Sequence, residues 1–203
     1  MAIVKRSRRR SSRRKKTWLY TGIFIAAVVV AAGLAMYFSK MPQRAAYPFK
    51  YKGEVMRSSE QYGLDPCLVA AVIYTESGFD PEARSSAGAI GLMQLMPETA
   101  EWAAGMRGMT YNEELLTEPQ YNIDIGCWLL NYLLNRCGGN RRYALIAYNA
   151  GYGTLESWLA DEQYLDENGD LAVIPYGETD AYVKKVESSY VIYLETYGDE
   201  FYK

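Results

Sequence analysis

The chain contains no histidine among its 203 residues. This absence excludes a Ser-His-Asp triad, a Cys-His nucleophile pair and a zinc ion held by histidine. Acid–base chemistry near neutral pH must therefore use a carboxyl group with a shifted pKa, or a lysine, cysteine or tyrosine. The sequence also lacks a P-loop and the glycine fingerprint of a dinucleotide-binding fold, which removes two common kinds of nucleotide site.

Cysteine is scarce, with three residues. Three thiols allow at most one internal disulfide and leave one thiol over. Cys127 and Cys137 lie in a stretch that we expect to be helical, where ten residues separate them by about 15 Å, too far for a disulfide. We therefore expect buried free thiols.

Acidic residues are absent from residues 1–40, which hold ten of the 22 lysines and arginines. All 24 acidic residues fall in 41–203, where the remaining 12 basic residues leave a net charge of −12. The two parts of the chain therefore suit different electrostatic surroundings.

Residues 18–38 form an apolar stretch of 21 residues without Asp, Glu, Lys or Arg. As a helix it is about 31 Å long, which matches a hydrocarbon core of roughly 30 Å. Aromatic residues near both ends suit the two membrane interfaces. A cleaved signal peptide is the alternative, but its apolar core is shorter and ends in small residues. The stretch therefore predicts an uncleaved transmembrane signal anchor.

A basic run precedes this apolar stretch directly. Such a run can bind nucleic acid, but next to a membrane span it is first a topology signal. The positive-inside rule predicts that residues 1–17 are a cytoplasmic tail and that the acidic remainder lies outside. We expect a single-pass membrane protein with no nucleic-acid partner, and the sequence does not indicate its protein partners.

Residues 39–47 are expected to be a linker, which leaves 48–203 as one globular domain. Hydrophobic residues make up 49% of the chain, enough for a packed core, and 19 residues are tyrosine. Tyrosine buries apolar area and keeps a polar end, which suits a carbohydrate-binding cleft as well as a tyrosine-rich core.

Helix start and stop signals predict a mainly helical domain. Asp65-Pro66 is typical of an N-cap followed by proline at the first helical position, and the apolar run after it predicts a buried central helix. Asn168-Gly169 indicates one hairpin turn. Further helices are expected to begin at Pro97 and Pro119 and to cover 141–149, stopped by Gly151 and Gly153, and about 179–197.

Glu76 directly follows the buried helix. Burial beside apolar residues disfavours the ionised carboxylate and raises its pKa, the shift that a general acid needs near neutrality. A solvated glutamate at a helix end is the alternative. The next segment, 85–97, contains small residues and glycines that let a backbone approach a ligand. In it, Gln94 offers an amide to sugar hydroxyls, and Met93 and Met96 offer apolar walls.

Taken together, four segments resemble the soluble lytic transglycosylase (SLT-like) family of peptidoglycan-cleaving enzymes. They span about 55–200 in the family's order: Glu-Ser-Gly-Phe-Asp-Pro at 76–81, Gly-Ala-Ile-Gly-Leu-Met-Gln-Leu-Met-Pro at 88–97, Ala-Tyr-Asn-Ala-Gly at 147–151, and Glu-Thr-Asp-Ala-Tyr-Val at 178–183. The resemblance implies a mainly α fold of the α+β lysozyme-like superfamily. It implies that Glu76 is the catalytic acid and base. The substrate-binding residues that it implies are Ser85, Gln94, Met96, Tyr148, Asn149 and Tyr182.

A glycosidase usually places two carboxylates beside the bond. The resemblance implies another route, in which the substrate's N-acetyl group stabilises the developing cation and the C6 hydroxyl of muramic acid attacks C1. The implied activity is cleavage of the β-1,4 bond between N-acetylmuramic acid and N-acetylglucosamine, with a 1,6-anhydro end and no cofactor. Two alternatives are a goose-type muramidase on the same fold, which uses water, and a non-catalytic wall-binding scaffold.

The spacing of Asp166, Asn168 and Asp170 is similar to the start of a calcium loop. Its glycine is misplaced, however, and Gly177 stands where the closing glutamate belongs. We therefore expect a plain turn and no metal site.

Overall fold

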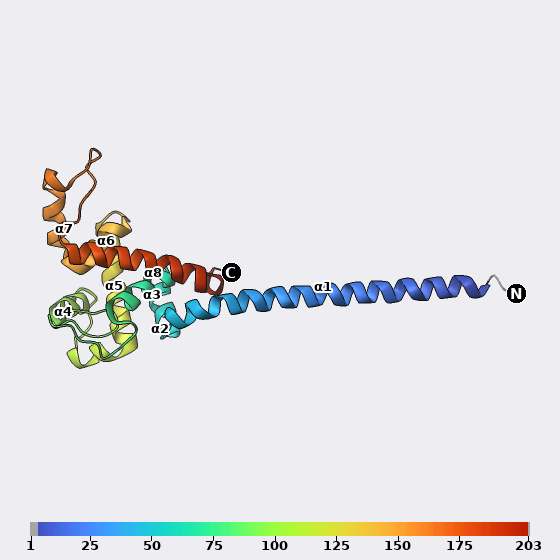
Figure 1. The fold of residues 1–203 in the computed structure, drawn as a ribbon. Coiled ribbons are helices and arrows are strands. Elements are labelled where there is room, and N and C mark those ends of the chain that lie inside the picture. The colour runs from blue at the N-terminus through green and yellow to red at the C-terminus, as the bar shows by residue number, and fades with distance from the viewer. Residues whose placement is uncertain (1–3, 203) are drawn as a thin grey trace. The chain divides into compact units, whose positions relative to one another are not determined.

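The computed structural model describes the backbone of residues 4–202 and the side chains of 18–35 and 41–202. The chain divides into two compact units, Met1–Ala46 and Tyr47–Lys203 (Figure 1). The first unit contains one helix, α1, which runs from Val4 to Ala46 and includes Pro42. The expected linker at 39–47 is therefore helical up to Ala46.

The apolar stretch lies within α1. Among the described residues, Trp18–Ala35 is the one helical segment long and apolar enough to cross a membrane, and none of it is buried. The predicted length and apolar composition of this segment are therefore found in one continuous helix.

The second unit is built from helices, which confirms the predicted mainly helical class; no named strand occurs among residues 47–202. Short antiparallel bridges join Arg84 to Ile90, Ile90 to Leu95 and Leu165 to Leu171. The elements are α2 (Lys52–Tyr62), α3 (Pro66–Ser77), α4 (Pro97–Met106), the 3-10 helix η1 (Glu113–Thr117), α5 (Pro119–Arg136), α6 (Arg141–Ala150), α7 (Tyr152–Leu159), the 3-10 helix η2 (Glu162–Tyr164) and α8 (Gly177–Phe201).

Helix α3 is the buried centre of this unit, as predicted. The Asp65 carboxylate accepts the N–H of Cys67 and caps the helix, and Pro66 occupies its first turn. Residues 66–73 are all buried. The long helix α8 packs along α3, and α5 packs against both α2 and α6 (Figure 1). Helix α3 itself packs against α8 and α2.

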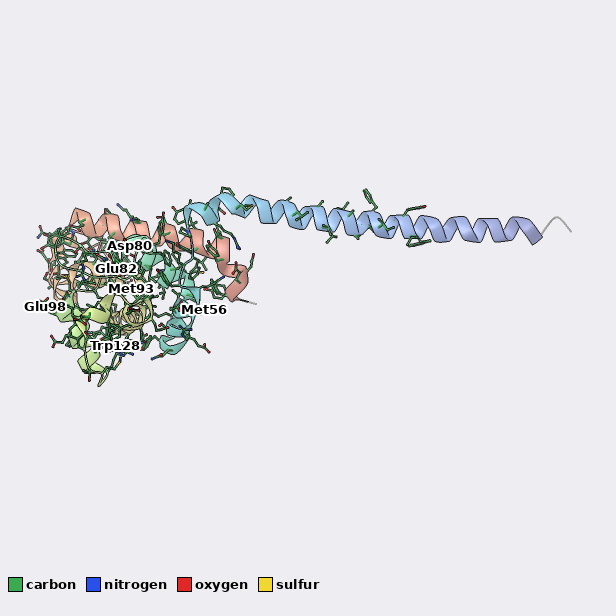
Figure 2. The ribbon with its side chains drawn as sticks, turned by 90° about the horizontal axis from the view of Figure 1, so that it is seen from below. Met56, Asp80, Glu82, Met93, Glu98 and Trp128 are labelled. Carbon is green, nitrogen blue, oxygen red and sulfur yellow. The ribbon has the colours of Figure 1, made fainter. Side chains whose placement is uncertain are left out.

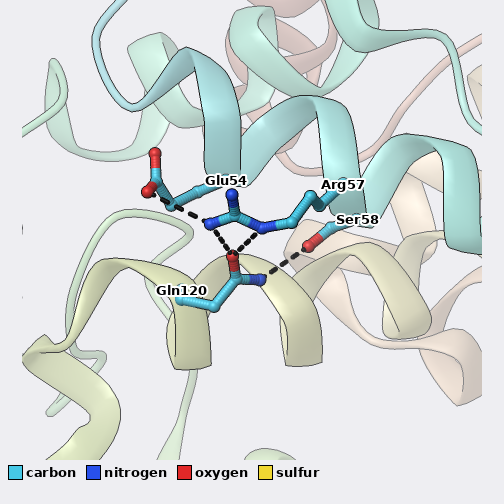
Figure 3. A network of polar contacts seen from close by, with 4 residues as sticks. All are labelled: Glu54, Arg57, Ser58 and Gln120. Atoms are coloured by element: carbon cyan, nitrogen blue, oxygen red, sulfur yellow. Dashed lines mark hydrogen bonds and ion pairs between the residues drawn. The ribbon is translucent and has the colours of Figure 1, made fainter.

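Helices α2 and α7 are absent from the sequence prediction. Helix α2 is fixed by long-range contacts (Figure 3): the Arg57 guanidinium donates to Gln120 Oε1 of α5 at 3.0 and 2.6 Å, and Gln120 donates to Ser58 at 3.2 Å. Helix α7 begins directly after Gly151, so the prediction that Gly153 stops the preceding helix is wrong. Gly151 alone makes the break, with φ 90°.

All three cysteines are free thiols, as predicted. Cys67 and Cys127 are buried, and burial raises the pKa of the Cys67 thiol to about 12. Cys137 is partly exposed rather than buried, because it lies just beyond the end of α5.

The segment from Asp166 to Asp170 forms the predicted hairpin turn. The Asp166 carboxylate accepts the backbone N–H groups of Asn168, at 2.8 Å, and of Asp170, at 3.0 Å. Leu165 and Leu171 are bridged across the turn. This carboxylate therefore stabilises the local backbone.

Candidate active site

Glu76 lies in the last turn of α3, where the apolar run ends. Burial raises the pKa of its carboxyl group to about 7, and burial is the one cause that acts in this direction. No carboxylate among the described residues contributes to the rise, so burial alone accounts for it. At neutral pH a large fraction of this group keeps its proton, which is the state that a general acid requires.

Two residues of α8 face Glu76 and moderate this shift. The Tyr182 hydroxyl lowers the pKa of Glu76 by its polar contact with the carboxyl group, and the Lys185 ammonium lowers it by charge. The Tyr182 hydroxyl is buried, yet its geometry falls short of a full hydrogen bond to any described residue. We infer that it contacts the Glu76 carboxyl closely but has hydrogen-bonding capacity left for a ligand.

The loop from Ser85 to Met96 is anchored on α5 by Asn122. This side chain is completely buried. Its amide nitrogen donates to the carbonyl oxygens of Ile90, at 3.0 Å, and Leu116, at 2.8 Å, and its oxygen accepts the N–H of Met93 at 2.8 Å. Sequence analysis missed Asn122, because an asparagine near a helix start is more often a solvated residue.

Two glycines let this loop approach α5 closely. A Cβ atom on Gly91 would lie 2.3 Å from the carbonyl oxygen of Leu116, and Gly91 has φ 81°. A Cβ atom on Gly126 would lie 2.4 Å from Met93 Sδ. Met93 (labelled in Figure 2) is completely buried, so the apolar wall predicted at this position does not face an open cleft. Its side chain packs against Gly126 instead.

Gln94 has a left-handed backbone, with φ 46°. Its amide nitrogen donates to the carbonyl oxygens of Ala83, at 3.1 Å, and Gly91, at 2.9 Å. The amide oxygen of this partly exposed side chain accepts no hydrogen bond from the described residues, so it is the end that a ligand hydroxyl can reach. Ser85 lies in the exposed part of the loop, where its hydroxyl accepts the N–H of Ala89 at 3.0 Å. Met96 is half-buried immediately before α4.

Tyr148 and Asn149 occupy the last turn of α6. The Tyr148 hydroxyl donates to the carbonyl oxygen of Met93 at 2.8 Å, which ties α6 to the loop. Burial of this hydroxyl and the nearby charge of Glu76 raise its pKa well above the ordinary value. Asn149 is exposed, and its side-chain oxygen accepts a hydrogen bond from Thr179 at 2.8 Å.

The structure thus brings Glu76, Tyr148 and Tyr182 into one electrostatic cluster from α3, α6 and α8. Ser77 also belongs to this region although the sequence did not single it out. Its hydroxyl donates to the carbonyl oxygen of Leu92 at 2.9 Å and so joins the helix that carries the acid to the loop that carries Gln94. What results is one proton-retaining carboxyl group between fixed polar groups, an arrangement suited to protonating a leaving oxygen.

This fold and this buried acid define a helical domain of the lysozyme-like class. The structure of the 70 kDa soluble lytic transglycosylase of Escherichia coli superposes with a TM-score of 0.71 at 31% identity, covering 77% of this chain and 26% of that one. The chain belongs to the Transglycosylase SLT domain family, whose model matches residues 55–170. The resemblance noted from the sequence is therefore confirmed.

Other relatives agree. The soluble lytic murein transglycosylase of Salmonella typhimurium is 34% identical over 143 residues, which are 69% of this chain and 22% of the relative. The membrane-bound lytic murein transglycosylase C of Edwardsiella ictaluri is 41% identical over 116 residues, 52% of this chain and 32% of the relative. An inactive mutant of the lytic transglycosylase Slt from Pseudomonas aeruginosa has a TM-score of 0.70 at 34% identity, covering 76% of this chain and 25% of that one. The chain thus spans between a fifth and a third of the length of these relatives.

Proposed function

We propose that this chain is a membrane-anchored peptidoglycan lytic transglycosylase. It cleaves the β-1,4 bond between N-acetylmuramic acid and N-acetylglucosamine and leaves a 1,6-anhydromuramic end. The observation that supports this most directly is Glu76, whose pKa is raised to about 7 by burial and not by a second carboxylate. A single acid fits a reaction in which the substrate supplies its own nucleophile.

The reaction has two proton transfers through Glu76. The protonated carboxyl gives its proton to the glycosidic oxygen as the bond to C1 breaks, and the substrate's N-acetyl oxygen stabilises the positive charge at C1. The resulting carboxylate then takes the proton of the C6 hydroxyl as that oxygen bonds to C1. Glu76 is protonated again at the end, and no water is consumed.

The remaining residues would position the sugar. The Gln94 amide oxygen is available to accept from a sugar hydroxyl, and the Tyr182 hydroxyl lies beside the acid. We propose that Ser85 and Met96 line the subsites next to the cleaved bond on the loop side, with Tyr148 and Asn149 opposite them. An intramolecular hydroxyl held in line has an effective concentration far above that of loose water, which favours the anhydro product.

The proposal includes the membrane. Trp18–Ala35 is long and apolar enough to span a bilayer, and one of the relatives is named as membrane-bound. The basic residues before the span would hold the N-terminus in the cytoplasm and place the catalytic unit outside.

Digestion of purified cell wall with the full chain in detergent tests the reaction. We expect glycan ends that are lighter than hydrolysed ends by the mass of one water and that borohydride does not reduce. Mostly reducible ends would show that water is the acceptor and that the protein is a muramidase. Undigested wall that still binds the protein would indicate a scaffold.

A further inference from the structure

A hollow lies on the Tyr148 side of the candidate active site. It has a volume of about 280 Å³ and lies between α4, α5, α6 and α7. Tyr148 lines this hollow with its ring, while its hydroxyl holds the loop of Gln94 through Met93. Tyr148 therefore belongs both to the candidate active site and to this hollow, which we call the Trp102–Arg136 pocket.

One wall of the Trp102–Arg136 pocket is aromatic. Trp102 of α4 is 40% exposed, and its ring meets that of Tyr132 at 5.1 Å in an edge-to-face arrangement. Trp128 stacks behind Tyr132 at 5.3 Å (Trp128 is labelled in Figure 2). Trp128 and Tyr132 thus support Trp102, whose ring is exposed inside a pocket. An exposed aromatic ring in a pocket is typical of a ligand site rather than of scattered surface exposure.

The other wall carries a positive charge. The Arg136 guanidinium lies 4.0 Å from the ring centroid of Tyr152 and donates to the Tyr132 hydroxyl at 3.0 Å. Two tyrosines thereby fix the guanidinium plane, and the side chain is exposed. No carboxylate of the described residues forms an ion pair with it, although residues 41–203 have a net charge of −12. A guanidinium held in this way keeps donors free for an external carboxylate.

We propose that the Trp102–Arg136 pocket is a subsite for a peptide-bearing muramyl residue of the glycan strand. The sugar ring lies against Trp102 and Tyr132, and a carboxylate of the attached peptide binds Arg136. This assignment rests on the proposed function, because it takes the same strand that the active site would cleave. It makes the protein selective for peptide-substituted glycan over bare glycan.

The test measures binding without cleavage. The full chain with Glu76→Gln, in detergent, is titrated with a peptide-bearing muramyl oligosaccharide and with the same molecule after its peptide carboxylates are converted to amides. We expect the carboxylate form to bind more tightly. Adding Arg136→Gln should weaken binding of the carboxylate form by about tenfold, the loss of one charge-assisted hydrogen bond, and should bring the two affinities together.

Two further variants complete the design. Trp102→Ala should weaken binding of both ligands, because it removes the surface for the sugar. Arg57→Gln is the matched control, since Arg57 is an exposed arginine on α2 whose partners are Glu54 and Gln120 (Figure 3), and it should change neither affinity.

The outcomes separate the two proposals. If Arg136→Gln weakens the binding of both ligands equally, or of neither, the carboxylate subsite is overturned. The proposed reaction is unaffected by that result. A Glu76→Gln chain that binds neither ligand overturns both. Selective binding together with hydrolytic products in the wall digest would support the subsite and overturn the transglycosylase reaction.

Discussion

The Nζ atom of Lys185 donates a hydrogen bond to the carbonyl oxygen of Thr75, at 3.2 Å, across a sequence separation of 110 residues. Thr75 immediately precedes Glu76, so this contact holds an ammonium group beside the end of α3. Burial pushes the pKa of Glu76 up, and the charge of Lys185 pulls it down. The balance leaves the acid with a pKa of about 7. Lys185 is a positioning residue that acts through Glu76.

Replacing Lys185 with methionine should raise the pKa of Glu76, because the cation that favours the carboxylate is lost. Since the proposed reaction needs the protonated acid, the alkaline limb of the pH profile of kcat/KM should move to higher pH. Lys185→Arg should restore most of the original profile. Lys184→Met, which removes an exposed lysine paired with Asp180, is the control and should leave the limb in place. An unchanged limb in Lys185→Met would contradict the role of Lys185.

Glu76→Gln keeps the shape of the side chain but cannot supply a proton. Wall-digesting activity should fall by about 10²–10⁴-fold, the range for general acid–base catalysis. Activity close to that of the original chain would move the acid elsewhere, with Glu178 as the next carboxyl to test.

The same variant should change stability in a pH-dependent way. The folded-state pKa of Glu76, about 7, lies above its ordinary value of 4.5. The original chain therefore loses stability as the pH rises from 4.5 to about 7. The Tm advantage of Glu76→Gln should therefore be small near pH 4 and largest above about pH 7. Thermal melts at several pH values measure it, and an advantage that is constant with pH would contradict the raised pKa.

Asn122→Ala should destabilise the domain by about 3 kcal/mol or more, because it leaves the N–H of Met93 and two carbonyl groups without their buried partner. Urea unfolding of the full chain measures this loss. Asn135→Ala is a matched control on the same helix. The Asn135 side chain is exposed and bonds only that of Asn131 among the described residues, so the substitution should change the free energy of unfolding by no more than about 0.5 kcal/mol. Equal effects of the two substitutions would show that Asn122 does not anchor the loop.

Gly126→Ala should destabilise the domain by about 1–3 kcal/mol through overpacking against Met93. Rotation of the Met93 side chain does not remove the clash, because its Cβ atom also lies 2.9 Å from the added carbon. Gly105→Ala in α4 meets nothing within 4 Å and should stabilise the chain by about 0.5–1 kcal/mol. Unfolding midpoints that shift in the same direction for both variants would contradict this packing.

The proposed topology is testable on intact protoplasts. External protease should remove residues 48–203 and leave a short protected N-terminal fragment, because the basic tail is expected on the cytoplasmic side. Complete protection of the domain would show that it lies on the cytoplasmic side. The cell wall could then not be its substrate.

The parts of the fold that the sequence predicted are those with local causes. Asp65-Pro66 and Pro119 mark helix starts in the chain itself, and the apolar run of α3 predicts its own burial. Helix α2 lacks such a signal, because its polar anchor joins Arg57 to Gln120, 63 residues away. The part of the site that lies in short motifs could also be predicted from the sequence, since Glu76 directly follows the apolar run of its helix.

The supports of the site were not predictable in this way. Lys185 and Thr75 are in contact because α8 packs along α3. The residue pattern within either helix does not predict this contact. Sequence analysis did not single out Arg136, because its contact with Tyr152 depends on how α5 and α7 are placed. Such relations require the positions of two helices at once.

Met93 has a consequence for how the site meets its ligand. Its N–H is bound by Asn122, its carbonyl oxygen by Tyr148, and its side chain is enclosed against Gly126. Helices α5 and α6 therefore hold this residue at its N–H, its carbonyl oxygen and its side chain. A ligand that binds at Gln94 therefore meets a loop that is already ordered. Little of its binding free energy is needed to order that loop. The amide proton of Met93 should exchange with deuterium only as slowly as the whole domain unfolds.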